Sequence, residues 1–334
     1  MKNNKEIKDN DKEIARKNVL RASSEISGVK IEGYDFDNGV NYMEILGKMS
    51  STGFQATMLG KAIEIINKMI KEKAFIYLGY TSNMASSGLR DVFRHLVKHK
   101  KVDVVVTTAG GIEEDIIKCL GDFVLGDFRA SGKELREKGI NRIGNVLVPN
   151  NRYIKFEKFF QEILVEVYGE QKKTGKSIMG YELIWKLGEK IDDERSIYYW
   201  AWKNKIKVYC PTLLDGAIGD NIYFFTFKNS DFMLDSVGDL KWFNDTTLGL
   251  ERSAVIILGG GVVKHSILNA NMLRNGADYA VYINNAQEFD GSDAGALPEE
   301  AVSWGKIKTN GESVKVFGDA TILFPLVVAE TFAN

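Results

Sequence analysis

The sequence predicts an α/β fold: a Rossmann-like, mostly parallel sheet with helices on both faces, plus a helical N-terminal extension. The first observation behind this prediction is that short runs of β-branched and aromatic residues alternate with longer helical stretches. Such spacing requires crossover connections, which produce a parallel sheet covered on both sides. The second is a helical period of apolar residues over 60–73, directly before the first run. The expected strands are residues 74–79, 102–107, 206–210, 254–258, 279–283 and 314–317.

Length and composition indicate a globular chain. Its 334 residues are 44% hydrophobic and 27% charged, enough to bury a large core. Residues 1–27 are polar and mixed in charge, so we expect them to form an arm outside the core, as a loose helix or a disordered segment. Residues 28–334 then form the main domain. The polar stretch 169–176 is the best candidate for a loop or insertion.

The charge balance argues against nucleic acid or an acidic membrane as a partner attracted by the overall charge of the chain. Lys and Arg number 44 and Asp and Glu 45, so no net field attracts nucleic acid or an acidic membrane. No apolar run approaches the roughly 18 residues of a membrane span, and the N-terminus lacks an apolar signal region. The two cysteines, Cys119 and Cys210, lie in apolar settings without zinc spacing. These features predict reduced thiols in a cytoplasmic protein without a metal site.

Glycines and hydroxyl residues follow three of the expected strands, at 81–88, 107–111 and 259–261. Open α/β sheets bind ligands at the carboxyl ends of their strands, where small residues let the backbone approach a pyrophosphate. None of the three segments is the G-x-G-x-x-G fingerprint, because Lys264 stands where the last glycine is required. One such segment is often only a tight turn. Together the three favour a dinucleotide site.

Acidic residues follow the same strand ends. An acid in this position can accept a hydrogen bond from a ribose hydroxyl, which favours NAD over NADP. Ordinary helix capping is the alternative for Glu113 and Asp215. The acids are Glu113, Glu114, Asp215, Asp220 and Asp319.

His265 follows the triple glycine, and Asn269 lies one helical turn further on. A histidine near its ordinary pKa can accept a proton during catalysis. The other two histidines, His95 and His99, lie on a basic helix, and we assign them no catalytic role.

Lys306 lies two residues after Trp304 and follows the acidic segment 288–293. A lysine amine becomes a nucleophile when burial or a nearby cation favours its neutral form, and it can then form an imine. The surrounding carboxylates suit a cationic amine substrate. A surface lysine whose stem lies along a tryptophan is the alternative, so this motif decides nothing by itself.

Several strings in order, at residues 82–88, 107–115, 259–265, 288–293 and 303–306, closely resemble deoxyhypusine synthase. The resemblance runs from about residue 33 to residue 333 without a large gap. It implies an NAD-dependent transferase that moves the aminobutyl group of spermidine onto one lysine of the precursor of translation initiation factor 5A. It also implies a homotetramer with active sites at subunit interfaces, and an N-terminal arm that covers a neighbouring subunit's site entrance.

The resemblance further implies residue roles. Lys306 would form the enzyme-imine intermediate, and His265 would take the proton when spermidine is dehydrogenated. Asn285 departs from the family, which more often has threonine there. The remaining spermidine positions would be Glu113, Glu114, Asp220, Gly260, Asn269, Tyr282, Gly291, Ser292, Asp293, Glu300 and Trp304. The NAD positions would be Ser82, Asn83, Met84, Ala85, Ser86, Thr108, Ala109, Gly110, Glu114, Asp215, Asn285, Ala286, Asp319 and Ala320.

Three alternatives remain at the level of sequence. A homospermidine synthase would deliver the same group to putrescine and share the pocket. A catalytically silent, NAD-binding partner subunit would not need Lys306 and His265, both of which are present. A sirtuin-like NAD-binding regulator is disfavoured because zinc-spaced cysteines are absent and the Trp304–Lys306 pair is present.

Overall fold

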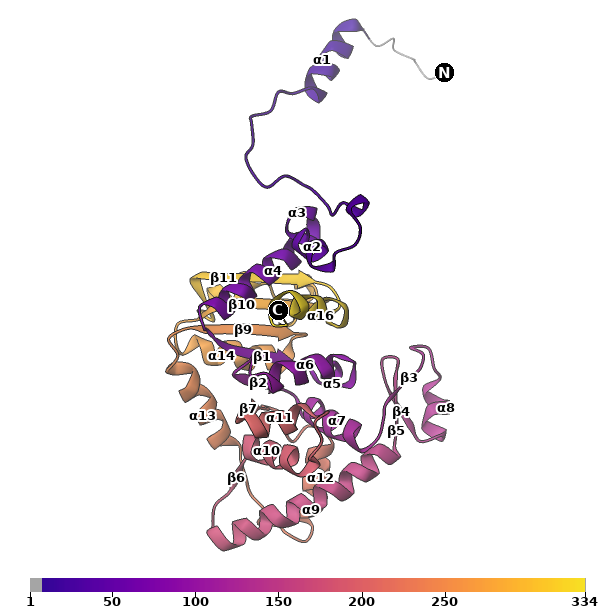
Figure 1. Ribbon diagram of the computed structural model, residues 1–334, viewed down its shortest axis with the longest axis vertical. Coiled ribbons are helices and arrows are strands. Elements are labelled where there is room, and N and C mark those ends of the chain that lie inside the picture. Colours follow the sequence, from indigo (N-terminus) through magenta and orange to yellow (C-terminus); the bar gives the residue numbers. More distant parts are fainter. Residues whose placement is uncertain (1–7, 334) are drawn as a thin grey trace.

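The computed structural model describes residues 8–333 and is organised around a six-stranded parallel sheet (Figure 1). Every neighbouring pair in this sheet is parallel, which confirms the predicted fold class and all six expected strands. In spatial order the strands are β11 (Ile307–Phe317), β10 (Ala277–Asn284), β9 (Ser253–Leu258), β1 (Phe75–Tyr80), β2 (Val104–Thr107) and β7 (Lys207–Tyr209).

The strand order reverses next to β1. From β1 the chain builds outward through β2 to β7, then returns to place β9 on the other side of β1 and continues outward to β10 and β11. Ligands of open α/β sheets bind outside the carboxyl ends of the strands at such a reversal. The topology therefore points to the loops that follow β1 and β9.

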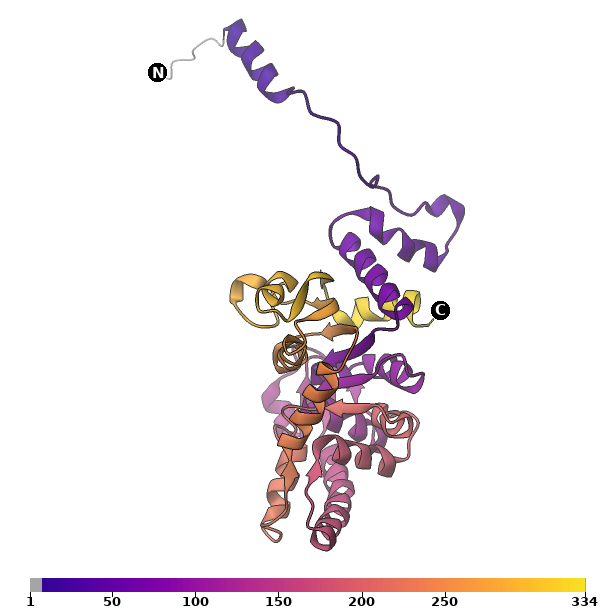
Figure 2. The same cartoon turned by 90° about the vertical axis from the view of Figure 1, so that its left-hand side faces the viewer.

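Alternate side chains of the strands enter two separate cores, because successive residues of a strand point to opposite faces. In β1, Leu78 belongs to the larger core and Tyr77 to the smaller one. The larger core is covered by α4 (Phe54–Lys71), α6 (Leu89–Lys98), α7 (Ala109–Leu120), α9 (Asn151–Thr174), α10 (Gly180–Ile191), α11 (Ile197–Asn204), α12 (Ala217–Thr226) and α16 (Ala320–Thr331). The smaller core is covered by α13 (Ser236–Leu248), α14 (Gly261–Met272) and α15 (Pro298–Ser303). Figure 2 shows the sheet between these two layers.

The prediction of a loop at residues 169–176 is wrong, because α9 continues to Thr174. The polar residues form the last turns of this helix. Gln171 is buried and donates from Nε2 to the Met233 carbonyl at 2.5 Å, while Lys172 pairs with Asp231 on the surface. Gly175 ends the helix in the left-handed conformation, with φ of 69°.

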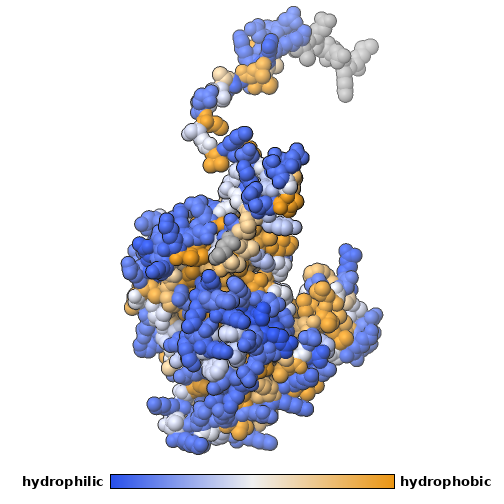
Figure 3. Space-filling model, viewed as in Figure 1, coloured by the Kyte–Doolittle hydropathy of each residue, from blue (hydrophilic) through white to orange (hydrophobic). Residues whose placement is uncertain are grey.

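An insertion between α7 and α9 was not predicted. It forms an antiparallel sheet of β3 (Val124–Leu125), β5 (Val146–Pro149) and β4 (Ile140–Ile143), with α8 (Gly132–Glu137) alongside. Apolar side chains gather on its outer surface, where Leu125 is 82% exposed and Phe128 67% exposed (Figure 3). A second small sheet pairs β6 (Ile178–Met179) with β8 (Leu234–Asp235).

The N-terminal segment stands away from the body of the molecule (Figures 1 and 2). Its helix α1 (Asp9–Val19) has no buried residue, and residues 20–33 are also exposed. The short helices η1 (Phe36–Asn38), α2 (Tyr42–Gly47) and α3 (Met49–Thr52) then lead into α4. Residues 1–7 of the predicted arm lie outside the described part of the chain. No helix within residues 8–333 combines the length and apolar character needed to cross a membrane.

Candidate active site

The loops at the strand-order reversal touch each other. Gly259 and Gly261 have φ of 84° and 60°, in the region that favours glycine. A Cβ atom on Gly260 would collide with Ala294, and one on Gly259 would lie 2.8 Å from the Thr81 hydroxyl oxygen. The triple glycine is therefore required by its own backbone and neighbours. It also adds no side chain at the carboxyl end of β9.

The predicted cofactor residues lie along this carboxyl edge. Residues 82–86 form α5 (Ser82–Ser86) directly after β1, and Thr108 is the N-cap of α7 after β2. A Cβ on Gly110 would come within 2.7 Å of the Ser82 Cβ, so the two segments pack closely. At the other end, Asn285 and Ala286 follow β10, and Asp319 and Ala320 follow β11. The edge is thus continuous from β11 to β2, and Asp215 extends it beyond β7.

Asp319 has a partner of its own. Its carboxylate accepts hydrogen bonds from the backbone N–H of Thr321 at 2.7 Å and from the Thr321 hydroxyl at 2.6 Å. It therefore caps α16, and a contact with ribose would be an additional role.

Four acids form what we call the carboxylate cluster: Glu113, Glu114, Asp215 and Asp220. Glu113 accepts from the Ile218 backbone N–H at 2.9 Å, so it stabilises the first turn of α12. The capping alternative is thus correct for Glu113, although the capped helix is not its own. Glu114 accepts from the Ser86 hydroxyl. Asp215 and Asp220 are exposed, beside and on α12.

Burial changes the protonation of the two glutamates. Burial is the main cause that raises the pKa of Glu114 to about 7, and the nearby charge of Glu113 raises it further. The pKa of Glu113 is also raised, mainly by burial, with Asp220 and Asp215 adding to the shift. A cationic ligand would favour the ionised form of both groups.

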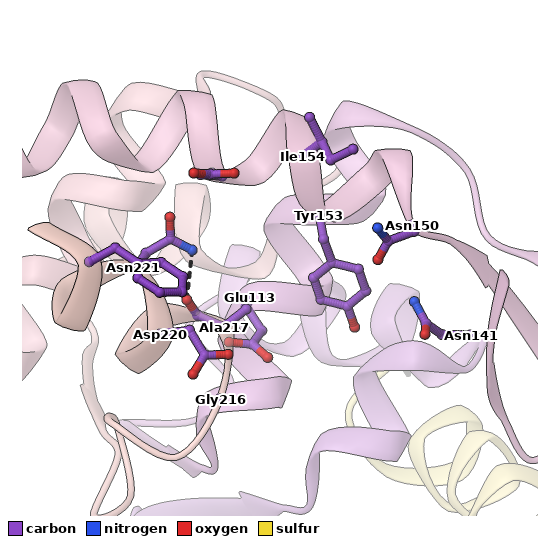
Figure 4. Close-up of a pocket in the computed structure, with 11 residues that line it drawn as sticks. Glu113, Asn141, Asn150, Tyr153, Ile154, Gly216, Ala217, Asp220 and Asn221 are labelled. Atoms are coloured by element: carbon purple, nitrogen blue, oxygen red, sulfur yellow. Dashed lines mark hydrogen bonds between the residues drawn. The ribbon is translucent and has the colours of Figure 1, made fainter. Parts of the chain in front are cut away.

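A cavity of about 590 Å³ opens beside this cluster (Figure 4). Glu113 and Asp220 point into it from α7 and α12, and the Tyr153 hydroxyl faces them from α9. Sequence reasoning missed Tyr153, together with Asn141 and Asn150 on the same wall. No sequence signal marked these residues, because they belong to the unpredicted insertion and to the start of the helix that follows it.

The second group, which we call the lysine cluster, comprises His265, Asn269, Tyr282, Asp293, Glu300, Trp304 and Lys306. Pro298 begins α15 and Gly305 ends it, with φ of 69°. The N–H of Gly305 bonds to the Val302 carbonyl at 2.9 Å, and that of Lys306 to the Ala301 carbonyl at 2.8 Å. This pair of bonds is a Schellman motif, and it reverses the chain between Trp304 and Lys306. The Lys306 ammonium consequently lies 5.7 Å from the Trp304 ring centre.

The rest of the lysine cluster combines exposed groups with buried, unpaired ones. His265 and Asn269 lie one turn apart on the exposed face of α14, and Trp304 is 64% exposed. The Tyr282 hydroxyl and the Asp293 Oδ2 atom are buried, yet neither has a hydrogen-bond partner among residues 8–333. Unpaired buried polar groups cost free energy, so both have capacity for a ligand.

Gly291 and Ser292 shape the chain before Asp293. Gly291 ends η2 (Glu288–Asp290) with φ of 71°, and the Ser292 hydroxyl accepts from the Gly295 N–H at 3.1 Å. Residues 291 to 293, all predicted as spermidine positions, therefore lie in one tight turn that ends at Asp293, whose Oδ2 atom is buried.

The two clusters lie apart within the chain. The carboxylate cluster follows β2 and β7 on the side of the larger core, whereas the lysine cluster lies by β10 and β11 on the side of the smaller core. Three strand spacings separate β10 from β2, roughly 14 Å. The cavity beside Glu113 is lined by neither His265 nor Lys306. The cavity of one chain therefore does not unite the two clusters.

Comparison with known proteins agrees with this description. The sequence profile of deoxyhypusine synthase matches residues 44–331. The chain is 51% identical to a deoxyhypusine synthase of Senecio vernalis and 50% identical to that of Nicotiana tabacum, each over 96% of this chain and 94% of the relative. A crystal structure from Entamoeba histolytica, assigned to the deoxyhypusine synthases, superposes with a TM-score of 0.69 at 38% identity, over 91% of this chain and 97% of the other. The chain thus belongs to the deoxyhypusine synthase family, which confirms the predicted class of enzyme, a transferase of hypusine biosynthesis.

Proposed function

We propose that the protein transfers the 4-aminobutyl group of spermidine to one lysine of the precursor of translation initiation factor 5A, with NAD as hydride carrier. Family membership supports the reaction. The observation that carries the residue assignment is the lysine cluster: the Lys306 ammonium lies 5.7 Å from the Trp304 ring centre, and two buried polar atoms, the Tyr282 hydroxyl and Asp293 Oδ2, have no partner among residues 8–333. Carboxylates and aromatic faces both attract ammonium groups, as a polyamine site requires.

The carboxyl edge of the sheet fits a dinucleotide. Helices α7 and α14 direct their N-terminal N–H groups toward this edge, and glycines at 110 and 259–261 keep it free of Cβ atoms. We assign Ser82–Ser86, Thr108–Gly110, Asn285, Asp319 and their predicted neighbours to its binding. When bound, NAD supplies hydride acceptance and hydride return. The acids Asp215 and Asp319 favour NAD, because an added ribose phosphate would be repelled.

The chain's own residues perform the transfer. His265 takes the proton released when spermidine loses a hydride and becomes an imine. The Lys306 amine attacks the imine carbon, and 1,3-diaminopropane leaves while the aminobutyl fragment stays bound to Lys306 as an imine. The acceptor lysine then displaces Lys306 by the same exchange, and reduction gives deoxyhypusine. The acids and Trp304 hold the polyamine in line with these two groups.

We further propose that each complete site forms between two copies of the chain within a homotetramer. The surfaces around both clusters are apolar and exposed, as a subunit interface requires. At the C-terminal end of α14, two turns beyond His265, Met272 is 39% exposed and Leu273 49% exposed. At the rim of the cavity on α12, Tyr223 and Phe224 are 62% and 54% exposed. The exposed N-terminal arm would cover the entrance of a neighbouring site.

Mixing two inactive variants tests the shared site. Lys306→Ala lacks the nucleophile of the lysine cluster, and Asp220→Ala lacks an acid of the carboxylate cluster. If the clusters of two chains meet, mixed oligomers regain roughly a quarter of wild-type activity, because half of random pairs are mixed and each of these has one intact site. Mixed oligomers without activity would place the whole site in one chain.

Trapping and acceptor competition test the reaction itself. Borohydride reduction in the presence of spermidine and NAD should add an aminobutyl group to Lys306, located by peptide mass. Supplying the precursor protein and putrescine separately distinguishes the proposed enzyme from a homospermidine synthase, and no trapped adduct would indicate a silent partner subunit.

Both cysteines are free, in keeping with our expectation of a cytoplasmic protein.

A further inference from the structure

Two buried lysines hold the segment between β10 and α15, which we call the 285–297 loop. Lys264 of α14 is 1% exposed and Lys315 of β11 is 5% exposed. The Lys264 ammonium donates to the carbonyls of Asp293 at 2.5 Å and Ala296 at 3.0 Å. The Lys315 ammonium donates to carbonyls at both ends of the loop, those of Ala286 (2.8 Å), Ala294 (3.4 Å) and Gly295 (2.6 Å).

Neither ammonium forms a salt bridge within residues 8–333. Backbone carbonyls and ring faces compensate the charges: Lys264 lies 4.6 Å from the Tyr282 ring centre, and Lys315 lies 4.4 Å from that of Phe317. Carboxylates act on both ammonium groups without direct pairing: Asp293 and Glu300 on Lys264, Glu288 and Asp290 on Lys315. Burial lowers the pKa of Lys264 to about 8 and also lowers that of Lys315. A buried charge without a paired carboxylate is costly, so an apolar residue would suit these positions better if packing were their only role.

Among residues 8–333, the other hydrogen bonds of the loop join its residues to each other, to Asn284 directly before it or to α15 directly after it. Helix η2 within it has no buried residue, and Phe289 is 85% exposed. Its inner end, in contrast, carries Asp293, whose buried Oδ2 atom has no partner. The two lysines donate to the carbonyls of Asp293 itself and of the three residues that follow it.

We propose that Lys264 and Lys315 are positioning residues of the transfer reaction, which fix Asp293 relative to His265 by clamping the 285–297 loop. Lys264 precedes His265 on the same helix, so the base and the clamp move as one body. Lys315 closes the loop by joining its first residues to its last. The catalytic part of this proposal rests on the proposed function, whereas the restraint of the loop does not.

Hydrogen–deuterium exchange of the full-length protein tests the restraint. Lys315→Met keeps the apolar stem and removes the three donated bonds, so amides of the loop should exchange about tenfold faster or more, with other peptides unchanged. Lys308→Met is the matched control on the same strand, because Lys308 pairs with Asp278 away from the loop. Its loop exchange should equal that of the wild type.

Spermidine-dependent kinetics test the positioning role. A misplaced Asp293 should raise the KM for spermidine by roughly tenfold or more with a smaller change in kcat. Lys264→Met should act in the same direction, and Lys315→Arg, which keeps the charge and its donors, should restore much of both properties.

Loop exchange within twofold of wild type in a folded variant overturns the clamp, and faster exchange with an unchanged KM overturns the positioning role. If neither methionine variant folds, loop exchange in Lys315→Arg decides whether the clamp exists. The guanidinium donors of arginine point in other directions than those of the lysine ammonium, so loop exchange should still be about threefold faster than in the wild type. Inactivity of the wild type would refute only the proposed function.

Discussion

The carboxylate cluster and the lysine cluster differ in the burial of their side chains and in the hydrogen-bond partners that the chain provides for them. Glu113 and Glu114 are buried and accept hydrogen bonds from Ile218 and Ser86, and Glu113 lines the cavity. The lysine cluster instead leaves His265 and Trp304 exposed and two buried polar atoms unpaired. The two buried glutamates are thus supported by contacts within their own chain, whereas the lysine cluster keeps capacity to bind a ligand.

The two clusters share one device for placing their loops. On the carboxylate side, Lys118 of α7 donates to three carbonyls at the end of α5, those of Ala85, Ser86 and Ser87, at 3.0–3.2 Å. Lys264 and Lys315 do the same for the 285–297 loop. The clusters therefore share lysine-to-carbonyl bonds and differ in the exposure of their side chains.

The largest effect is expected for Lys306→Ala, which removes the nucleophile and leaves the carboxylate cluster intact. Modification of the protein substrate should fall by roughly ten-thousandfold, because the proposed mechanism carries the fragment on the Lys306 amine. NAD and spermidine should still bind, and slow NADH formation should persist. Lys308→Ala, two residues further along, should retain activity. Substantial modification by a normally assembled Lys306→Ala protein would mean that the acceptor lysine attacks directly.

His265→Ala should fail at an earlier step than Lys306→Ala. Loss of a positioned general base costs about a hundredfold to ten-thousandfold, so the rate of NADH formation itself should fall by this factor. The matched control is His99→Ala, at the exposed end of α6. An unchanged rate of NADH formation after spermidine is added would remove His265 from the mechanism.

Replacing one acid from each cluster tests whether both contact the same substrate. Asp220→Ala and Asp293→Ala should each weaken spermidine binding by roughly 2–5 kcal/mol, because each would leave a partly desolvated ammonium group unpaired. Asp245→Ala, on the surface of α13, should change it little. Calorimetric titration measures all three. An effect from only one of the two acids would assign spermidine to a single cluster.

The smallest effect concerns the pH dependence introduced by Glu114. Its pKa of about 7 in the folded chain exceeds the ordinary value of 4.5. The folded state therefore binds the proton more tightly, and this contribution to stability is lost as pH rises through about 7. Spermidine affinity should change in the opposite direction. As pH rises toward 7, the affinity should increase about tenfold per pH unit, because the ammonium group of spermidine binds the ionised carboxylate of Glu114.

Glu114→Gln isolates this group. The variant should lose the affinity slope, and its melting temperature relative to wild type should be higher at about pH 8 than at about pH 5. Glu189→Gln, exposed on α10, should keep both wild-type slopes. A slope that survives in Glu114→Gln would assign the titration to Glu113 or another member of the cluster.

The sequence by itself determined the secondary structure of the sheet and the family. Each strand was identified from its own run of β-branched and aromatic residues, which is local information, and the family from strings around Lys306 and His265 that stand in one order. Local signals failed at residues 169–176, where the polar composition came from the exposed surface of a helix end. They also failed at the insertion, whose strands of two to four residues are too short to show a period.

Only the tertiary structure decided how these parts lie relative to one another. The return of β9 to the side of β1 places the edge that we propose for the dinucleotide, and it separates the two clusters onto opposite faces of the sheet. The clamping lysines were also beyond sequence reasoning, since the carbonyls bound by Lys264 and Lys315 lie 20 to 32 residues away. Backbone carbonyls are the same in every residue, so a bond between a lysine and a distant carbonyl leaves no mark in the sequence.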